Sequence, residues 1–285
     1  MHAFSFALLF CLPLLAQQAP LPGLPPREAV LEEVAVRYDV AKWPRGQRRA
    51  GLALGAVALK GFVGGPVEQD GELPPQRAFS DEREQRVLLV QAYVGEQTDD
   101  AQKRALGWLA NVSKPGTVPT AAAAGIPVGD IGFVGWSKPA ERRIAWIVFV
   151  RDNLAVRVSC MDPSENPHPD LAAVAQTIDA AIAQEPLVAA GPLPRPKLPR
   201  CVADRTHVRA GENVVLSIEA TDPAGSPTLQ FEVQGPGQGY VTADAGRWLL
   251  RTTGPGRLVV QVKARGVRGL ATTQSVIIDV APRDD

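Results

Sequence analysis

The sequence has no net charge with which to attract a polyanion. Its 285 residues hold 30 lysines and arginines against 30 aspartates and glutamates, so the formal net charge is zero. Proteins that bind nucleic acid or anionic lipid through their overall field have a clear excess of basic residues. We therefore expect no nucleic-acid partner.

Histidine and cysteine are scarce, at three residues each. Nucleophilic catalysis needs a serine or cysteine beside a histidine that a carboxylate holds in place. Beyond the N-terminal segment the only histidines are His168 and His207. The run Gly135-Trp136-Ser137 lacks the closing glycine and the helix of a nucleophile elbow, because Lys138-Pro139 follows, and we interpret it as a turn between strands. We identify no catalytic residue and no cofactor. The motifs do not decide whether the protein is an enzyme, but they favour a protein without catalytic activity.

Long apolar runs are missing except at the N-terminus. Residues 1–16 read MHAFSFALLFCLPLLA, an apolar stretch ending in a small residue that suits signal-peptidase cleavage. About 14 apolar residues, interrupted by Pro13, are too few to cross a bilayer core of about 30 Å. Lipidation of Cys11 is disfavoured, because Phe10 stands where a small residue is needed. We expect a cleaved signal peptide, no transmembrane segment after cleavage, and export to the bacterial periplasm, cell surface or medium.

Two proline-rich segments divide the remaining chain. Residues 17–26 contain the run APLPGLPP, and residues 186–199 read PLVAAGPLPRPKLP, with prolines too frequent for regular structure. We therefore predict a spacer at 17–26, a first domain at 27–185, a linker at 186–199 and a second domain at 200–285.

The first domain has the pattern of an α+β fold. Residues 86–94 are apolar and β-branched, as in a central strand, and Thr98 is placed to cap an amphipathic helix that ends before Pro115. Residues 144–150 and 154–160 predict a tight hairpin, because Asp152 and Asn153 tolerate positive φ. A second helical stripe starts after Pro169-Asp170. We expect a mainly antiparallel sheet with packed helices, preceded within 28–75 by one helix and one or two strands.

The hairpin and the helix after it carry a resemblance. The run WIVFVRDNLAVRV, followed by a helix with Ala175 and Ile178-Asp179, resembles the closing hairpin and helix of uncharacterised exported bacterial proteins and of extracellular sensor domains on bacterial kinases. The match spans about a quarter of the domain. It implies an extracytoplasmic α+β module and no particular activity.

The second domain shows short alternating strands separated by turn residues. We expect seven strands, two of them short ones near Thr206 and Tyr240, within about 85 residues, the size of an immunoglobulin-type β-sandwich. The other five are 213–220, 228–234, 247–252, 257–264 and 272–280.

This domain also resembles a family. The stretches AGENVVLSIEATDP, GRWLLRTTGPGRLVVQVKARG and VIIDV are similar to the immunoglobulin-like modules of the PKD and cadherin-like kind in bacterial surface proteins. The chain lacks the clustered acidic motifs of calcium-binding cadherin repeats, and Arg265 stands where such modules often carry an aspartate. The resemblance therefore implies a β-sandwich without calcium.

One loop holds four potential metal ligands: Asp162, Glu165, His168 and Asp170. The interleaved prolines favour another interpretation, in which Asp170 caps a helix and the other three side chains are solvated. We expect no metal site.

Two tryptophans are candidates for ligand contact. Trp43 and Trp136 each lie near a proline in an expected loop, whereas the other three tryptophans lie in periodic apolar segments. The basic cluster Arg45, Arg48 and Arg49 is expected to be solvated surface rather than an anion site.

Cys160 and Cys201 are the two cysteines left after signal cleavage. They flank the predicted linker in a compartment that permits disulfides, so we predict a disulfide between them. The alternative is two separate thiols, with Cys160 buried on the apolar face of its strand.

These observations favour an exported, non-catalytic binding or scaffolding protein whose partner is an extracytoplasmic protein or glycan. The support is domain type, which is an associational argument. The alternatives are an exported hydrolase with a site assembled in the first domain, and a small-ligand sensor with an apolar cavity.

Overall fold

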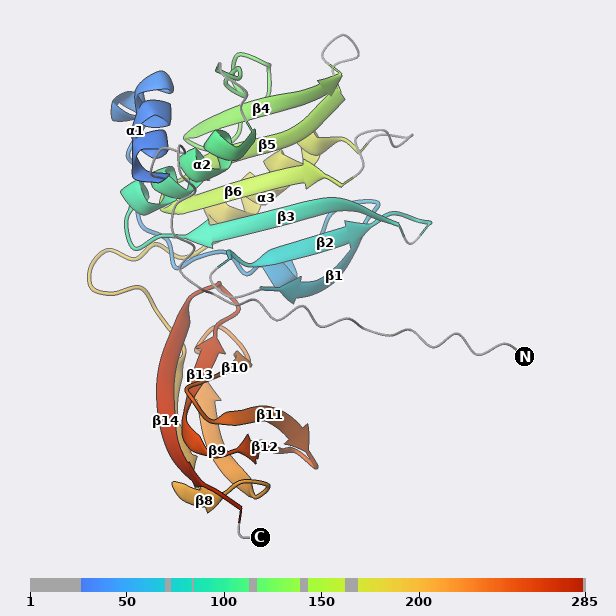
Figure 1. Cartoon of the computed structure of the whole chain (residues 1–285). Coiled ribbons are helices and arrows are strands. Elements are labelled where there is room, and N and C mark those ends of the chain that lie inside the picture. The colour runs from blue at the N-terminus through green and yellow to red at the C-terminus, as the bar shows by residue number, and fades with distance from the viewer. Residues whose placement is uncertain are drawn as a thin grey trace.

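The structure is a computed structural model that describes residues 27–69, 73–83, 85–112, 117–138, 143–161 and 169–283. It consists mostly of antiparallel β-sheets with three α-helices in the described residues. A six-stranded sheet with its helices forms the larger part, and two four-stranded sheets form the smaller part (Figure 1).

In its described residues the larger part contains three α-helices and six strands. The strands lie in the order β1-β2-β3-β6-β5-β4, with antiparallel neighbours throughout. The elements are α1 (Arg27–Arg37), β1 (Val63–Glu68), β2 (Gln76–Ser80), β3 (Arg86–Val94), α2 (Thr98–Val112), β4 (Ile131–Lys138), β5 (Arg143–Arg151), β6 (Leu154–Cys160) and α3 (Leu171–Gln184). Short 3-10 helices lie at Val40–Lys42 and Leu54–Ala56.

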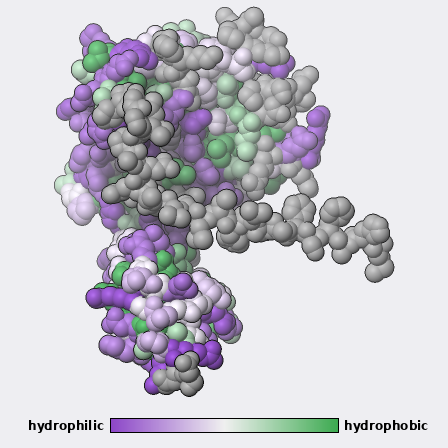
Figure 2. Space-filling model, viewed as in Figure 1, coloured by the Kyte–Doolittle hydropathy of each residue, from purple (hydrophilic) through white to green (hydrophobic). Residues whose placement is uncertain are grey.

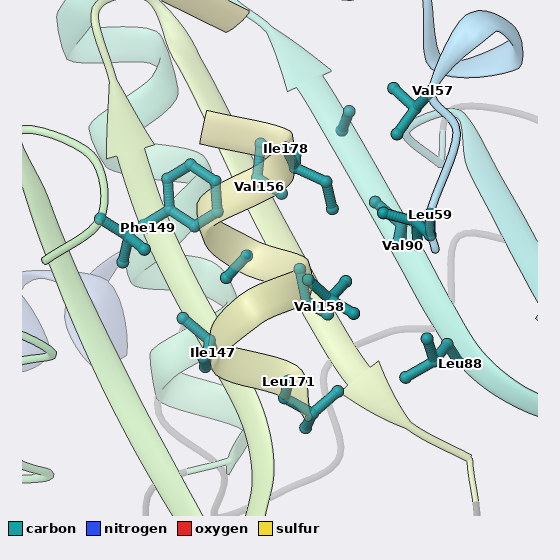
Figure 3. Close-up of a cluster of buried hydrophobic side chains, with 14 of the residues drawn as sticks. Val57, Leu59, Leu88, Val90, Ile147, Phe149, Val156, Val158, Leu171 and Ile178 are labelled. Carbon is teal, nitrogen blue, oxygen red and sulfur yellow. The ribbon is translucent and has the colours of Figure 1, made fainter. Parts of the chain in front are cut away.

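Helices cover both faces of this sheet. On one face α3 packs over β5 and β6, with Ile178 against Phe149 and Val156 in a fully buried core (Figure 3). On the other face α2 packs over β5 and β6, and α1 packs against α2. Successive side chains of a strand point to opposite faces of the sheet. In β3 and β6, the residues that alternate with those packed under α3 therefore face the α2 side.

Several sequence predictions are confirmed in this part. The strand at 86–94 and the hairpin at 143–160 form as expected, and Asp152 takes a positive φ of 57° in the two-residue turn. Asp170 caps α3 by accepting a hydrogen bond from the amide of Ala173 at 3.1 Å.

Two local predictions were wrong. Thr98 does not cap α2: its hydroxyl donates to the carbonyl of Gly46, and the carboxylate of Asp100 accepts from the amide of Gln97 instead. The run Gly135-Trp136-Ser137 is not a turn but lies within β4, where the register with β5 shifts on either side of Trp136.

The smaller part consists of eight strands in two four-stranded sheets, one more strand than expected. The sheet orders are β10-β13-β14-β8 and β11-β12-β9-β7, and apolar residues of both sheets share one core. The strands are β7 (Lys197–Ala203), β8 (His207–Arg209), β9 (Asn213–Thr221), β10 (Thr228–Gln234), β11 (Gln238–Asp244), β12 (Arg247–Gly254), β13 (Gly256–Arg265) and β14 (Ala271–Ala281).

The additional strand, β7, begins inside the predicted linker 186–199. It contains Pro199, which cannot donate a ladder hydrogen bond. The strand tolerates this proline because β7 is at a sheet edge and its register with β9 shifts between Lys197 and Arg200.

The two parts are in direct contact. Arg268 donates from Nε to the carboxylate of Glu185 at 2.8 Å, and the same carboxylate accepts from the amide of Ala53 at 2.9 Å. Gly51, with φ 123°, lies so close to Arg268 that a Cβ there would be 2.6 Å from its carbonyl oxygen. The loop between β13 and β14 is therefore held against the larger part.

The predicted disulfide between Cys160 and Cys201 is not formed. Cys160 ends β6 opposite Leu88 and belongs to the core under α3, whereas Cys201 lies in β7 opposite Ile218 and packs against the core of the smaller part. Each sulfur is directed into the packing of its own sheet, which is the alternative of two separate thiols.

None of the helices within the described ranges has the length and apolar character needed to cross a membrane.

Candidate functional site

A groove lies on the α2 side of the six-stranded sheet, where α2 leaves β3 and the neighbouring strands partly uncovered. Its floor comes from Gln91 and Tyr93 of β3 and Arg157 of β6. These residues face this side because their neighbours Val90 and Val158 point into the opposite core. Gln91 and Arg157 are directly paired across the two strands.

The walls of the groove come from the two helices and from one loop. α1 contributes Leu31, α2 contributes Gly107 and Trp108, and the loop before β2 contributes Leu73. The volume of the groove is about 610 Å³, within the range of pockets that hold small organic ligands. Figure 2 shows the molecule from the same side as Figure 1, with hydrophilic residues over most of the visible surface and hydrophobic residues gathered toward the right of the larger part.

Basic side chains outnumber acidic ones among the described residues that line the groove. The basic residues are Arg27, Lys103, Arg104 and Arg157, and the acidic ones are Glu28 and Asp100. One of these acids is already engaged, because Asp100 accepts from the amide of Gln97 at 3.0 Å. A chain without net charge thus has a locally positive groove.

Arg157 is the residue of the groove whose environment is hardest to explain by packing alone. Its side chain is half-buried, and Nε is buried without a hydrogen-bond partner. Desolvation by this burial lowers the pKa of the guanidinium. A buried, unsatisfied donor is uncommon in native proteins and often marks a functional position.

Tyr93 is held beside Arg157 by α2. The guanidinium of Arg104 lies 4.8 Å from the centre of the Tyr93 ring, a cation–π contact. Burial, and next the negative charge of Asp100, raise the pKa of Tyr93, so its hydroxyl keeps its proton and can donate a hydrogen bond. The groove therefore presents an aromatic ring with a polar end.

A second, smaller pocket of about 240 Å³ lies beside Trp43. Trp43 itself is 5% exposed, donates from Nε1 to the carbonyl of Tyr38 at 3.0 Å, and packs against Phe133. Its ring is mainly a core group, with one side toward the pocket. Trp136 packs against the core on the opposite face of the sheet, so the two candidate tryptophans are not brought together.

The loop with four potential metal ligands, at which we expect no metal site, lies mostly outside the described residues, which exclude Asp162, Glu165 and His168. The fourth candidate, Asp170, caps α3. Within the described ranges, no three histidine, cysteine, aspartate or glutamate side chains are grouped to hold a metal ion.

The arginine cluster at 45–49 was expected to be solvated, and for two of its members this was wrong. The side chain of Arg49 is 14% exposed and is paired with Asp152 of the hairpin turn, while Arg48 donates to the carbonyl of Glu96 at 2.9 Å. Arg45 remains exposed. Gly46 permits this approach, because a Cβ there would lie 2.4 Å from the Cα of Asp152.

The hairpin turn is the centre of an ionic network. Asp130 accepts from the amide of Asp152 at 2.6 Å, and Arg151 forms two hydrogen bonds with Asp179 of α3. Desolvation, partly opposed by this amide and by Arg151, raises the pKa of Asp130. With every charge partnered inside the protein, the network connects β5, β6 and α3 rather than offering a binding site.

His207 is the one histidine among the described residues, and it lies between a hydroxyl and a carboxylate. Its Nδ1 is 3.1 Å from Oγ1 of Thr206, and its Nε2 is 3.6 Å from Asp279. The side chain is 81% exposed, so water competes for each of these contacts. This open position does not favour a role for His207 in activating a nucleophile.

Sequence reasoning missed Arg157 and Tyr93. The available signal was Arg157 as the sole charge in the strand LAVRVSC, on the face opposite Val156 and Val158. Alternation alone does not distinguish a solvated arginine from one in a groove, because that depends on which helix lies above it.

No protein-family model matches this chain, and no curated protein matches it.

Proposed function

We propose that the protein is an exported binding protein without catalytic activity, in which the α+β domain binds a small ligand in the groove and the second domain acts as a spacer or scaffold. The groove of about 610 Å³ over β3 and β6 is the observation that carries the proposal.

The proposal includes a domain division. The α+β domain extends from residue 27 to 185, and an immunoglobulin-like β-sandwich follows. The shared apolar core of the two four-stranded sheets supports the second assignment. The contacts of Arg268 and Glu185 support a spacer that holds the first domain in a fixed orientation.

The composition of the groove favours binding over nucleophilic catalysis. The described residues that line it supply aromatic rings, amides and guanidinium groups, but no histidine, serine or cysteine. Such donors and rings orient a ligand. A sensor with a closed apolar cavity is less well supported, because the lining is rich in charged residues.

The test is a ligand screen on the purified protein with a variant that fills the groove. Gly107 of α2 lines the groove, and nothing lies within 4 Å of the position of its Cβ. The indole of Gly107→Trp is therefore expected to occupy the groove without disturbing the core. Gln176→Trp, at an exposed position of α3 on the opposite face, is the matched control.

We expect the screen to find small molecules that raise the midpoint of thermal unfolding of the wild type and of Gln176→Trp. The same molecules should leave the midpoint of Gly107→Trp unchanged. Ligands that stabilise Gly107→Trp as strongly as the wild type bind elsewhere. A screen that yields no groove ligand would contradict the proposed function.

A further inference from the structure

The most unusual feature of the groove is an arginine on its floor, Arg157, for which the described part of the chain supplies no ion-pair partner. Nε of Arg157 is buried without a hydrogen-bond partner, although its strand neighbour Gln91 is close enough to be paired with it in register. Gln91 nevertheless makes no hydrogen bond to this Nε: its side-chain Nε2 donates to Oε1 of Gln76 at 3.2 Å, and its own Oε1 does not accept from Arg157.

The residues around Arg157 add further positive charge to the groove. Lys103 and Arg104 on α2 and Arg27 on α1 face the same groove. Glu28 is exposed, and the Asp100 carboxylate already accepts from the amide of Gln97. An isolated, partly desolvated guanidinium costs free energy that an acceptor would recover.

The rest of the groove indicates what accompanies the acceptor. The ring of Tyr93 and one edge of the mostly buried Trp108 line the same groove as Arg157, and Leu31 and Leu73 form apolar walls. Tyr93 can donate a further hydrogen bond through its hydroxyl. This combination suits a molecule with an anionic end and a flat or apolar body.

We propose that the ligand of the groove is a small organic anion, a carboxylate or a phosphate ester, whose charged group is bound by Arg157 and whose apolar body lies against Tyr93 and Trp108. The inference rests on the proposed function and adds the chemical class of the ligand. Arg157 is thus the residue that determines selectivity for anions, and Lys103 and Arg104 attract the ligand from solution.

The experiment compares three probes by calorimetric titration: benzoate, phenyl phosphate and the neutral benzamide. The proteins are the wild type, Arg157→Gln, Gly107→Trp and Arg251→Gln. Arg251 is the matched control, a half-buried strand arginine of β12. Removing an unpaired half-buried charge is not expected to unfold the protein, and a thermal melt of each variant verifies this.

We expect at least one of the two anions to bind the wild type and Arg251→Gln equally, and to bind Arg157→Gln about tenfold to a hundredfold more weakly, the loss of a charge-assisted hydrogen bond. Binding to Gly107→Trp should be abolished. The two anionic arms distinguish a carboxylate from a phosphate ligand, and benzamide should bind the wild type no better than Arg157→Gln.

Two results would overturn the inference in different ways. If benzamide binds as well as the anions, Arg157→Gln has no effect and Gly107→Trp abolishes binding, the groove binds ligands but not through the anion, and the proposed function stands. If neither anion binds the wild type at millimolar concentration, or if Gly107→Trp leaves their binding unchanged, the anion site is absent from the groove.

Discussion

Arg151 donates two hydrogen bonds to the carboxylate of Asp179, at 2.8 and 2.6 Å, and so connects the end of β5 to α3. The pair is asymmetric in exposure, at 30% for the Arg151 side chain and 12% for that of Asp179. A bidentate pair of this kind fixes orientation as well as distance.

Asp179→Ala is expected to lower the free energy of unfolding by about 2 kcal/mol, because it leaves Arg151 without its main partner in a partly buried site. Urea denaturation followed by circular dichroism measures this change. Gln176→Ala, on the exposed side of the same helix, is the control and should be near neutral. Equal losses in the two variants would show that the pair contributes nothing.

The same network predicts a pH dependence through Asp130. Desolvation raises the pKa of Asp130 in the folded protein above its ordinary value of 3.8, so the folded state holds this proton more tightly than the unfolded state. Its contribution to stability is therefore lost as pH rises from the ordinary value through the raised one.

Asp130→Asn should accordingly gain stability relative to the wild type as pH rises through that range, since the asparagine does not titrate. Urea denaturation at a series of pH values measures the difference. Asp244→Asn, at an exposed position of β11, is the control substitution. A difference for Asp130→Asn that is flat with pH, or that has the opposite slope, would contradict the assignment.

Asn153 is a fully buried polar residue whose side chain joins three segments. Its Oδ1 accepts from the amide of Arg49 at 2.7 Å, and its Nδ2 donates to the carbonyls of Gly95 and Arg49 at 2.7 and 3.1 Å. Asn153→Ala should cost about 3 kcal/mol, because these buried backbone groups lose their partner.

Chemical denaturation measures that cost, and Asn213→Ala, at an exposed position of β9, serves as reference. A loss below about 1 kcal/mol would mean that other groups or water satisfy the three backbone atoms equally well.

Arg265 is a residue whose replacement is expected to maintain or increase the stability of the protein rather than lower it. It is 8% exposed, and Nε and Nη2 have no hydrogen-bond partner, although Nη1 donates to the carbonyl of Gly269 at 3.0 Å. Burial lowers the pKa of Arg265 to about 10. The charge therefore destabilises the folded state below that pH, and the penalty disappears as pH rises above it toward the ordinary pKa of an arginine.

Arg265→Met should therefore leave stability at neutral pH unchanged or increase it by about 1 kcal/mol. Thermal unfolding measures the change, with Arg251→Met, in β12 of the other four-stranded sheet, as the control. A clear loss of stability in Arg265→Met alone would show that the bond to Gly269 outweighs the buried charge.

Some elements follow from the local sequence. The turn at Asp152-Asn153 needs a residue that tolerates positive φ at Asp152, and the strands on each side carry apolar residues that pack on both faces of the sheet. The start of α3 at Asp170 depends on one side chain and the amide three residues away. Because these interactions lie within a few residues of one another, their pattern in the sequence is sufficient to predict them.

Other features depend on residues that are far apart in the chain. The side chain of Arg49 is largely covered where it pairs with Asp152, more than a hundred residues later. Cys160 and Cys201 remain apart because each belongs to a different sheet. The sequence determined that Arg157 lies on the face of β6 opposite Val156 and Val158. Whether that face is covered, exposed or grooved was decided only in three dimensions, by the placement of α1 and α2 over the sheet, which long-range packing sets.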